Sequence, residues 1–95
     1  MNTALIPDDP GSVIRAQKAD ADRYHLSYTL YRTDFTVGGG HAYSLAVTVE
    51  SASGRETAFA GDITRKRSRA LKLFALISRG LVTPCTLFDV LEDML

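Results

Sequence analysis

Apolar and polar residues alternate along two segments in the first half of the chain. In the first segment every second residue is Tyr or Leu, at Tyr24, Leu26, Tyr28 and Leu30. In the second segment the larger apolar residues recur in the same way, at Tyr43, Leu45, Val47 and Val49. A period of two is typical of a β-strand with one buried face. Three consecutive glycines separate the segments, and glycine accepts positive φ without steric cost, so the pattern predicts a β-hairpin.

The alternation leaves two pairing registers open for this hairpin. Pairing Tyr31 with Val47 places the odd-numbered residues of both strands on one face, whereas pairing Leu30 with Val47 places the Leu and Tyr residues of the first strand there. We favour the second register, because leucine needs burial more than threonine does. Tyr31 and Phe35 then lie on the opposite face, which the N-terminal arm or a second copy of the chain would cover. We predict these two residues as a self-association surface.

The segments around the hairpin show weaker signals. Residues 1–12 contain two prolines, two aspartates and a glycine in close succession, and we expect them to form a loosely ordered arm. Val13 and Ile14 suggest a short strand or turn, but the residues after them show no clean period. Beyond the hairpin, a short third strand is expected at residues 55–60, between a Ser-Gly turn and Gly61.

The last third of the chain changes to a helical period. Apolar residues recur at i, i+3, i+4, i+7 and i+11, at Ala70, Leu73, Phe74, Ile77 and Leu81. Asp62 or Thr64 is expected to cap this helix, and Gly80 to end it in the left-handed conformation. Thr83 and Pro84 are typical of the N-cap and first position of a second helix. Its apolar face consists of Leu87, Val90, Leu91 and Met94.

The order of these elements predicts one α+β domain spanning residues 1–95. It contains an antiparallel sheet of three strands, or four if residues 13 and 14 begin another, and a C-terminal two-helix hairpin packed on one face. An apolar fraction of 45% and a charged fraction of 23% are ordinary for a globular protein.

The net charge is zero, but charge is segregated within the two expected helices. Residues 64–79 contain six basic and no acidic side chains, whereas the second helix contains Asp89, Glu92 and Asp93 and no basic residue. Basic residues are unfavourable at a helix N-terminus, as acidic ones are near a C-terminus. Antiparallel packing would bring the two sets together as internal ion pairs, which would set the orientation of the hairpin.

The alternative is that the basic residues bind a partner. The predicted partner surface is a basic stripe formed by Arg65, Lys66, Arg69, Lys72, Leu76 and Arg79. A phosphate backbone fits such a surface, but the chain has no recognised nucleic-acid motif. An apolar residue within a basic stripe favours a protein partner. We therefore predict a small non-catalytic regulatory or adaptor protein that binds a protein partner or a second copy of itself. A nucleic-acid-binding module using residues 64–79 is the alternative.

Catalytic, metal and cofactor sites are not expected. Cys85 lies near a helix start, where a thiolate is stabilised, but a nucleophile also needs a base, and the only histidines are His25 and His41. The three glycines lack the Lys-Ser/Thr that follows a phosphate-binding loop. Strand tyrosines that could stack bases are more typical of a core. The sequence therefore indicates no enzyme, no metal, no cofactor and no small-molecule substrate.

The chain shows no membrane signal. No apolar run approaches the length of a transmembrane helix, and the first residues lack the basic and apolar regions of a signal peptide. With a single cysteine, no internal disulfide can form. We expect a cytoplasmic protein.

The C-terminal residues resemble those of a known group. The resemblance lies in Asp62-Ile63-Thr64 before the first helix and in the run Leu81-Val82-Thr83-Pro84-Cys85-Thr86-Leu87-Phe88-Asp89-Val90-Leu91-Glu92-Asp93. A similar Val-Ser/Thr-Pro and Asp-Val-Ile/Leu-Glu-Asp pattern closes small uncharacterised proteins of clostridia-like bacteria, grouped as a domain of unknown function. The resemblance implies a bacterial intracellular origin. It implies no activity and no functional residue.

Overall fold

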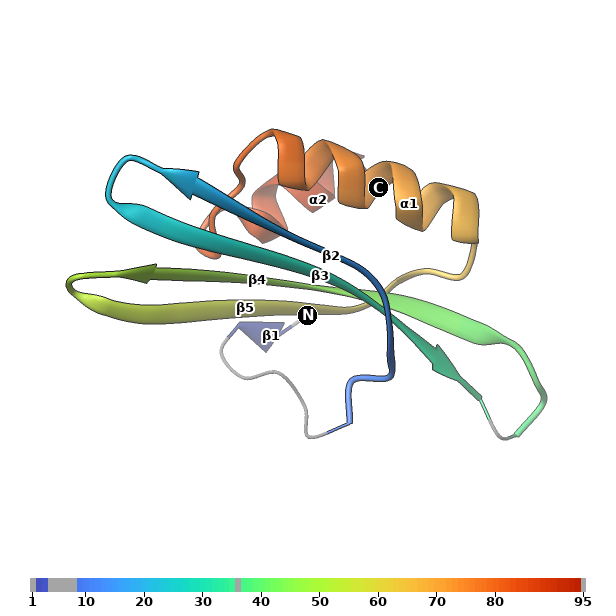
Figure 1. Ribbon diagram of the computed structural model, residues 1–95. Helices are drawn as coiled ribbons and strands as arrows, with labels where there is room; N and C mark the ends of the chain where they lie inside the picture. The colour runs from blue at the N-terminus through green and yellow to red at the C-terminus, as the bar shows by residue number, and fades with distance from the viewer. Residues whose placement is uncertain (1, 4–8, 36, 95) are drawn as a thin grey trace.

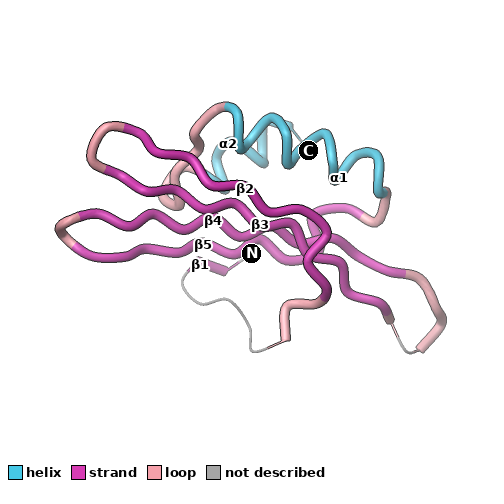
Figure 2. The backbone as a smooth tube through the Cα atoms, viewed as in Figure 1, coloured by secondary structure: helices cyan, strands magenta, loops and turns pink. Residues whose placement is uncertain are grey.

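The computed structural model describes residues 2–3, 9–35 and 37–94. Its elements are β1 (Asn2–Thr3), β2 (Ser12–Ala21), β3 (Tyr24–Asp34), β4 (His41–Ser51), β5 (Gly54–Thr64), α1 (Arg67–Arg79) and α2 (Leu87–Met94). The strands form one antiparallel sheet in the order β1-β5-β4-β3-β2, and both helices cover the same face of it (Figure 1, Figure 2). The predicted α+β architecture is confirmed.

The number of long strands matches the alternative of four rather than the expected three. The sheet has four long strands, and the two-residue β1 adds a fifth at one edge. The sequence pattern does not reveal the full length of β2, because most of its side chains are exposed and an edge strand needs no regular apolar face. Within the predicted arm at residues 1–12, residues 1 and 4–8 lie outside the described part, whereas Asn2 and Thr3 pair with β5.

The pairing of β3 with β4 preserves the predicted faces but not the predicted partners. Tyr28 is opposite Val47, and Leu30 is opposite Leu45. The observed register is shifted by two residues from the favoured pairing of Leu30 with Val47. A shift of two keeps each side chain on its face, since successive side chains in a strand alternate. The apolar rows of both strands therefore face the helices as expected, and Tyr31 lies on the opposite face.

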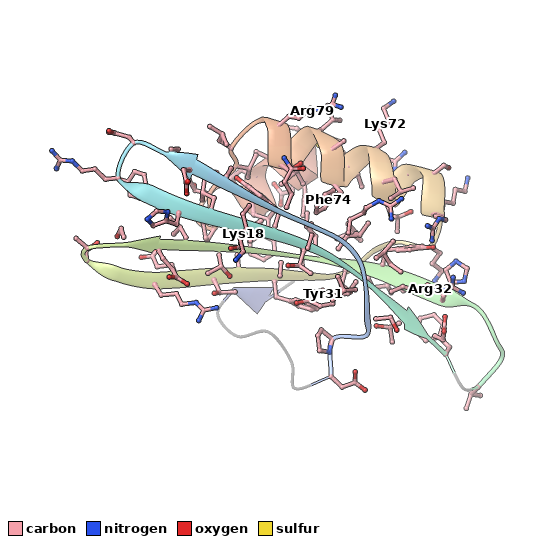
Figure 3. The ribbon with its side chains drawn as sticks, in the orientation of Figure 1. Lys18, Tyr31, Arg32, Lys72, Phe74 and Arg79 are labelled. Carbon is pink, nitrogen blue, oxygen red and sulfur yellow. The ribbon has the colours of Figure 1, made fainter. Side chains whose placement is uncertain are left out.

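A buried layer lies between the sheet and the helices. Leu30 and Leu45 of the sheet and Ile77 of α1 are all fully buried. Figure 3 shows Phe74 pointing from α1 toward the sheet, and Tyr31 on the other side of the sheet. Four of the five apolar residues predicted for one face of α1 are buried there, whereas the fifth, Leu81, lies after the helix and is exposed. The helix α2 adds Leu87 and Leu91 to the same layer.

The chain leaves the sheet through an irregularity in β5. The register between β4 and β5 shifts between Tyr43, which is opposite Thr64, and Leu45, which is opposite Ala60. Within this segment Asp62 has a φ of 51°, and its backbone N–H donates to Oγ of Ser44 at 3.2 Å. Aspartate tolerates the left-handed region better than most residues. The bulge redirects the chain toward α1, so Asp62 shapes the end of the strand and is not the cap of the helix.

The end of α1 also differs from the prediction. Gly80 has a φ of −77° and is helical, whereas the left-handed residue is Leu81, with a φ of 51°. The N–H of Val82 donates to the carbonyl of Ile77 at 3.3 Å, and the N–H of Leu81 donates to that of Ser78 at 3.4 Å. These two bonds form a Schellman motif, in which glycine usually occupies the position of Leu81.

The second helix begins later than predicted. We expected Thr83 as N-cap and Pro84 as the first helical residue, but residues 84–86 form a turn and α2 starts at Leu87. Hydroxyl Oγ1 of Thr83 lies 3.0 Å from that of Thr86, and the first helical bond runs from Val90 N–H to the Thr86 carbonyl. Pro84 is buried within this turn before the helix.

The two buried tyrosines of the core have opposite hydrogen-bonding states and predict opposite responses to substitution. The hydroxyl of Tyr28 donates to the carbonyl of Val82 at 2.9 Å, whereas the buried hydroxyl of Tyr43 has no partner among the described residues. Tyr28→Phe is expected to lower the free energy of unfolding by about 1 kcal/mol. Tyr43→Phe is expected to leave it unchanged or raise it by up to about 1 kcal/mol, because a buried hydroxyl without a partner is costly. Chemical denaturation measures both.

Tyr28 also predicts how the stability changes at alkaline pH. Burial raises the pKa of Tyr28 above its usual 10.0. A raised pKa means that the native state holds this proton more tightly than the unfolded state does. The resulting stability is complete below pH 10.0 and is lost as the pH rises through the raised pKa. Tyr28→Phe should therefore flatten the alkaline decline of the free energy of unfolding. An unchanged decline would contradict this assignment.

The left-handed Leu81 predicts a stabilising substitution. A non-glycine residue in this region costs about 1–2 kcal/mol, and glycine avoids that cost but loses more entropy on folding. Leu81→Gly is therefore expected to raise the free energy of unfolding by up to about 1 kcal/mol. Leu81→Ala keeps the positive φ and is the matched control, for which no gain is expected. Denaturation of the three proteins tests this, and a less stable glycine variant would argue against strain at this position.

Candidate partner-binding surface on the first helix

The start of α1 forms a basic hollow on the surface. Its volume is about 610 Å³, and its walls are formed by Thr64, Arg65, Lys66, Ser68, Arg69 and Lys72. Four of these six residues are basic, and all four have exposed side chains. The structure therefore brings together the first four basic residues of the predicted stripe.

The helix N-terminus inside this hollow has no side-chain cap. Lys66 occupies the N-cap position, with extended backbone angles and no capping hydrogen bond from its side chain, and the first turn contains no acidic residue. The first N–H groups of a helix are unpaired and carry partial positive charge. A lysine at this position adds like charge to that end. The local electrostatics therefore favour an anion from outside the helix.

The predicted internal ion pairs between α1 and α2 are not found among the described residues. None of the ion pairs within residues 2–3, 9–35 and 37–94 joins a basic residue of α1 to Asp89, Glu92 or Asp93. The guanidinium of Arg69 instead donates to the main-chain carbonyl of Met94 at 2.9 Å. This bond shows that the end of α2 lies beside the start of α1. The exposed acidic side chains of α2 face solvent instead.

The stripe continues along the exposed side of α1 beyond the hollow. Leu76 lies on this side and is 45% exposed. Arg79 lies in the last turn, where its charge is favourable to the helix dipole. Figure 3 shows Lys72 and Arg79 pointing away from the sheet. The six predicted residues therefore form one exposed surface, with four around the hollow and Leu76 and Arg79 farther along.

The two residues predicted for self-association lie in different surroundings. Tyr31 packs against Phe59, with ring centroids 6.3 Å apart. Phe35 lies under the guanidinium of Arg65, whose central carbon is 5.2 Å from the ring centroid. This cation–π contact ties the loop after β3 to the basic hollow. The sequence gives no signal for this role of Phe35, because the two residues are 30 positions apart.

Cys85 and the two histidines have different contacts in the described part of the chain. Sγ of Cys85 is exposed and lies 3.3 Å from Oγ1 of Thr83. The imidazole of His25 is 2.6 Å from a carboxylate oxygen of Asp20, and His41 packs edge-on against Tyr43. Neither histidine forms a described hydrogen bond with Cys85. The described residues also contain no group of three or more His, Cys, Asp or Glu side chains suited to a metal ion.

The comparisons with known proteins identify a family but no activity. The model of a family of unknown function, DUF6514, matches residues 12–95, so the chain belongs to this family. The predicted membership of a family of unknown function is therefore confirmed. No curated protein and no solved structure matches the chain. Among the described residues, none of the helices has the length and apolar character needed to span a bilayer.

The uncapped N-terminus of α1 predicts that Lys66→Asp stabilises the protein. An aspartate at the N-cap accepts a hydrogen bond from the first turn and places negative charge at the positive end of the helix. The free energy of unfolding is expected to rise by about 1 kcal/mol. Arg79→Asp at the other end is the matched control, and it should lower the stability by about 0.3–1 kcal/mol. Denaturation measures both changes, and a loss of stability in Lys66→Asp would show that the helix end is not short of negative charge.

Proposed function

We propose that this protein is a small non-catalytic regulatory or adaptor protein that captures a protein partner on the basic stripe of α1. The observation that carries the proposal is the basic hollow at an uncapped helix N-terminus, whose four cations form no ion pair within the described residues. An acidic segment of a partner would supply the missing negative charge. The same charge arrangement destabilises the isolated helix, so a selective benefit in binding would explain its presence.

The partner best suited to this surface is acidic and carries an apolar residue. Leu76 is exposed between Lys72 and Arg79, so the stripe offers a hydrophobic contact flanked by cations. Protein interfaces combine an apolar centre with a polar rim in this way. A phosphate backbone would use the cations but not the leucine.

Three finer proposals accompany this one. Self-association through Tyr31 and Phe35 would produce a homodimer, although Phe35 already contacts Arg65 and would have to serve both surfaces. A bacterial origin and a cytoplasmic location follow from the resemblance of the C-terminal tail. The chain is proposed to need no cofactor and no small-molecule substrate.

A charge reversal on the stripe tests the proposed function. The variant Arg65→Glu/Arg69→Glu/Lys72→Glu is titrated against a fluorescent peptide of alternating Glu and Leu, and binding is read by anisotropy. We expect at least a tenfold loss of affinity, with a thermal midpoint within a few degrees of the wild type, because the replaced side chains are exposed. The matched control is Arg15→Glu/Lys18→Glu/Arg23→Glu, which makes the same charge change at exposed positions in β2 and the turn after it.

Two outcomes would contradict the proposal. Equal losses in the two triple variants would mean that the peptide responds to net charge alone. Tight binding of labelled DNA or RNA, with a salt dependence close to a log–log slope of about −3.6 for four neutralised phosphates on duplex DNA, would favour the nucleic-acid alternative. A second peptide with Ser in place of Leu shows whether Leu76 contributes, and we expect it to bind more weakly.

A further inference from the structure

A second, apolar hollow lies at the other end of α1. Its volume is about 260 Å³, and it forms where the loop between α1 and α2 meets the ends of β2–β5. Its walls consist of Ala21, Tyr24, Leu26, Val49, Glu56, Leu81, Thr83, Pro84 and Cys85. Figure 1 shows the α1–α2 loop at the same end of the sheet as the β2–β3 and β4–β5 turns. The hollow is thus formed by the ends of four strands and one loop, which are distant in the sequence.

Two apolar side chains stand exposed on the rim of this hollow. Tyr24 is 50% exposed, and Leu81 is 42% exposed. Leu81 is also the left-handed residue of the Schellman motif, with a φ of 51°, at a position where glycine would be less strained. A strained backbone that holds a leucine at the surface is a recognised feature of functional sites. Large exposed apolar side chains around a hollow are typical of a binding surface.

The rim also carries a carboxylate without a partner. The side chain of Glu56 is exposed, and no ion pair within the described residues includes it. A more polar hollow of about 220 Å³ adjoins the apolar one and shares Tyr24, Val49 and Glu56 with it. Arg55, which also lines the polar hollow, lies 3.7 Å from the carboxylate of Glu50, so its charge is already partly balanced. The negative charge of Glu56 therefore favours a cation beside the apolar hollow.

We propose that this apolar hollow binds one apolar side chain of a partner protein, with a basic residue next to it in the partner sequence. The hollow is smaller than the roughly 300–1,000 Å³ typical of small-molecule sites, and its volume suits one anchoring side chain. The exposed Tyr24 and Leu81 add contact area for the residues that flank this anchor. Glu56 pairs with the adjacent cation, and this charge complementarity sets the preferred sequence of the partner.

This site goes beyond the proposed function, because the two surfaces have opposite preferences. The basic hollow begins at residue 64 and takes an anionic segment, whereas the apolar hollow lies beyond the C-terminal end of α1 and takes an apolar–basic segment. Lys72 is the last residue that lines the basic hollow, and it lies about 10 Å along the helix from the end of α1 at Arg79, beyond which Leu81 lines the apolar hollow. One molecule therefore has room to bind both kinds of segment at once.

Selection of peptides from a random heptapeptide phage library against the intact protein tests this proposal. We expect the enriched sequences to place Leu, Ile, Met or Phe beside Lys or Arg. A synthetic copy of the most enriched peptide is then titrated against the variant Cys85→Phe, whose larger side chain fills the hollow, and at least a tenfold loss of affinity is expected. Lys18→Phe is the matched control, because Lys18 is an exposed residue of β2 that lines neither the apolar nor the polar hollow.

Two further measurements show whether a loss of binding reflects misfolding of a variant, and whether the charge of Glu56 contributes to the affinity. Alkylation of Cys85 in the folded wild type with N-ethylmaleimide fills the same hollow without a mutation, and we expect it to abolish binding of the peptide. Glu56→Gln is expected to lower the affinity for the peptide roughly fivefold, because it removes one exposed ion pair. A peptide with Glu in place of its basic residue should bind more weakly still.

The proposal is overturned if no sequence is enriched, if the enriched sequences lack an apolar–basic pair, or if alkylation and Cys85→Phe leave their binding unchanged. These outcomes are independent of the basic stripe, because the test uses a different peptide and different variants. Failure of the acidic peptide to bind the stripe therefore leaves this experiment able to succeed.

Discussion

The structure depends on the burial of one face of the sheet under α1. Leu30 and Leu45 of the sheet and Ile77 of the helix have no exposed surface. Burying such side chains contributes about 1.5–3 kcal/mol each. Because α1 is held along its whole length, its other face is constrained to point outward. The exposed basic stripe is therefore a consequence of core packing, and its orientation requires no ion pair.

Core packing also explains how α1 tolerates its unfavourable electrostatics. A helix with basic residues at an uncapped N-terminus is intrinsically less stable than one with an acidic first turn. Packing against the sheet supplies stability that the helix ends do not, so the protein tolerates the unfavourable charges. The bond from Arg69 to the Met94 carbonyl and the stacking of Arg65 on Phe35 hold two of these cations in place without neutralising them. The surface keeps its positive charge and gains rigidity.

The two ends of α1 differ in chemistry because they end differently. At its start the chain arrives from the β5 bulge at Asp62 and places cations around unpaired N–H groups. At its end the Schellman motif reverses the chain within two residues and projects Leu81 to the surface beside Tyr24. Strain at Leu81 and like charge at Lys66 are both local costs that a stability-optimised sequence would avoid. Their presence at the two candidate surfaces is the common feature that links these surfaces.

The sequence by itself determined the central hairpin, most of the apolar face of α1 and the α+β order, because each follows from local periodicity and spacing. It did not determine β2, whose edge position removes the need for an apolar face, or the two-residue shift in the β3–β4 register, which preserves the same faces. Only the tertiary structure decided that Leu81 rather than Gly80 is left-handed, and that Arg65 stacks on Phe35. It alone also assembled the apolar hollow, since the lining residues come from strands and a loop that meet only when the sheet and helices pack together.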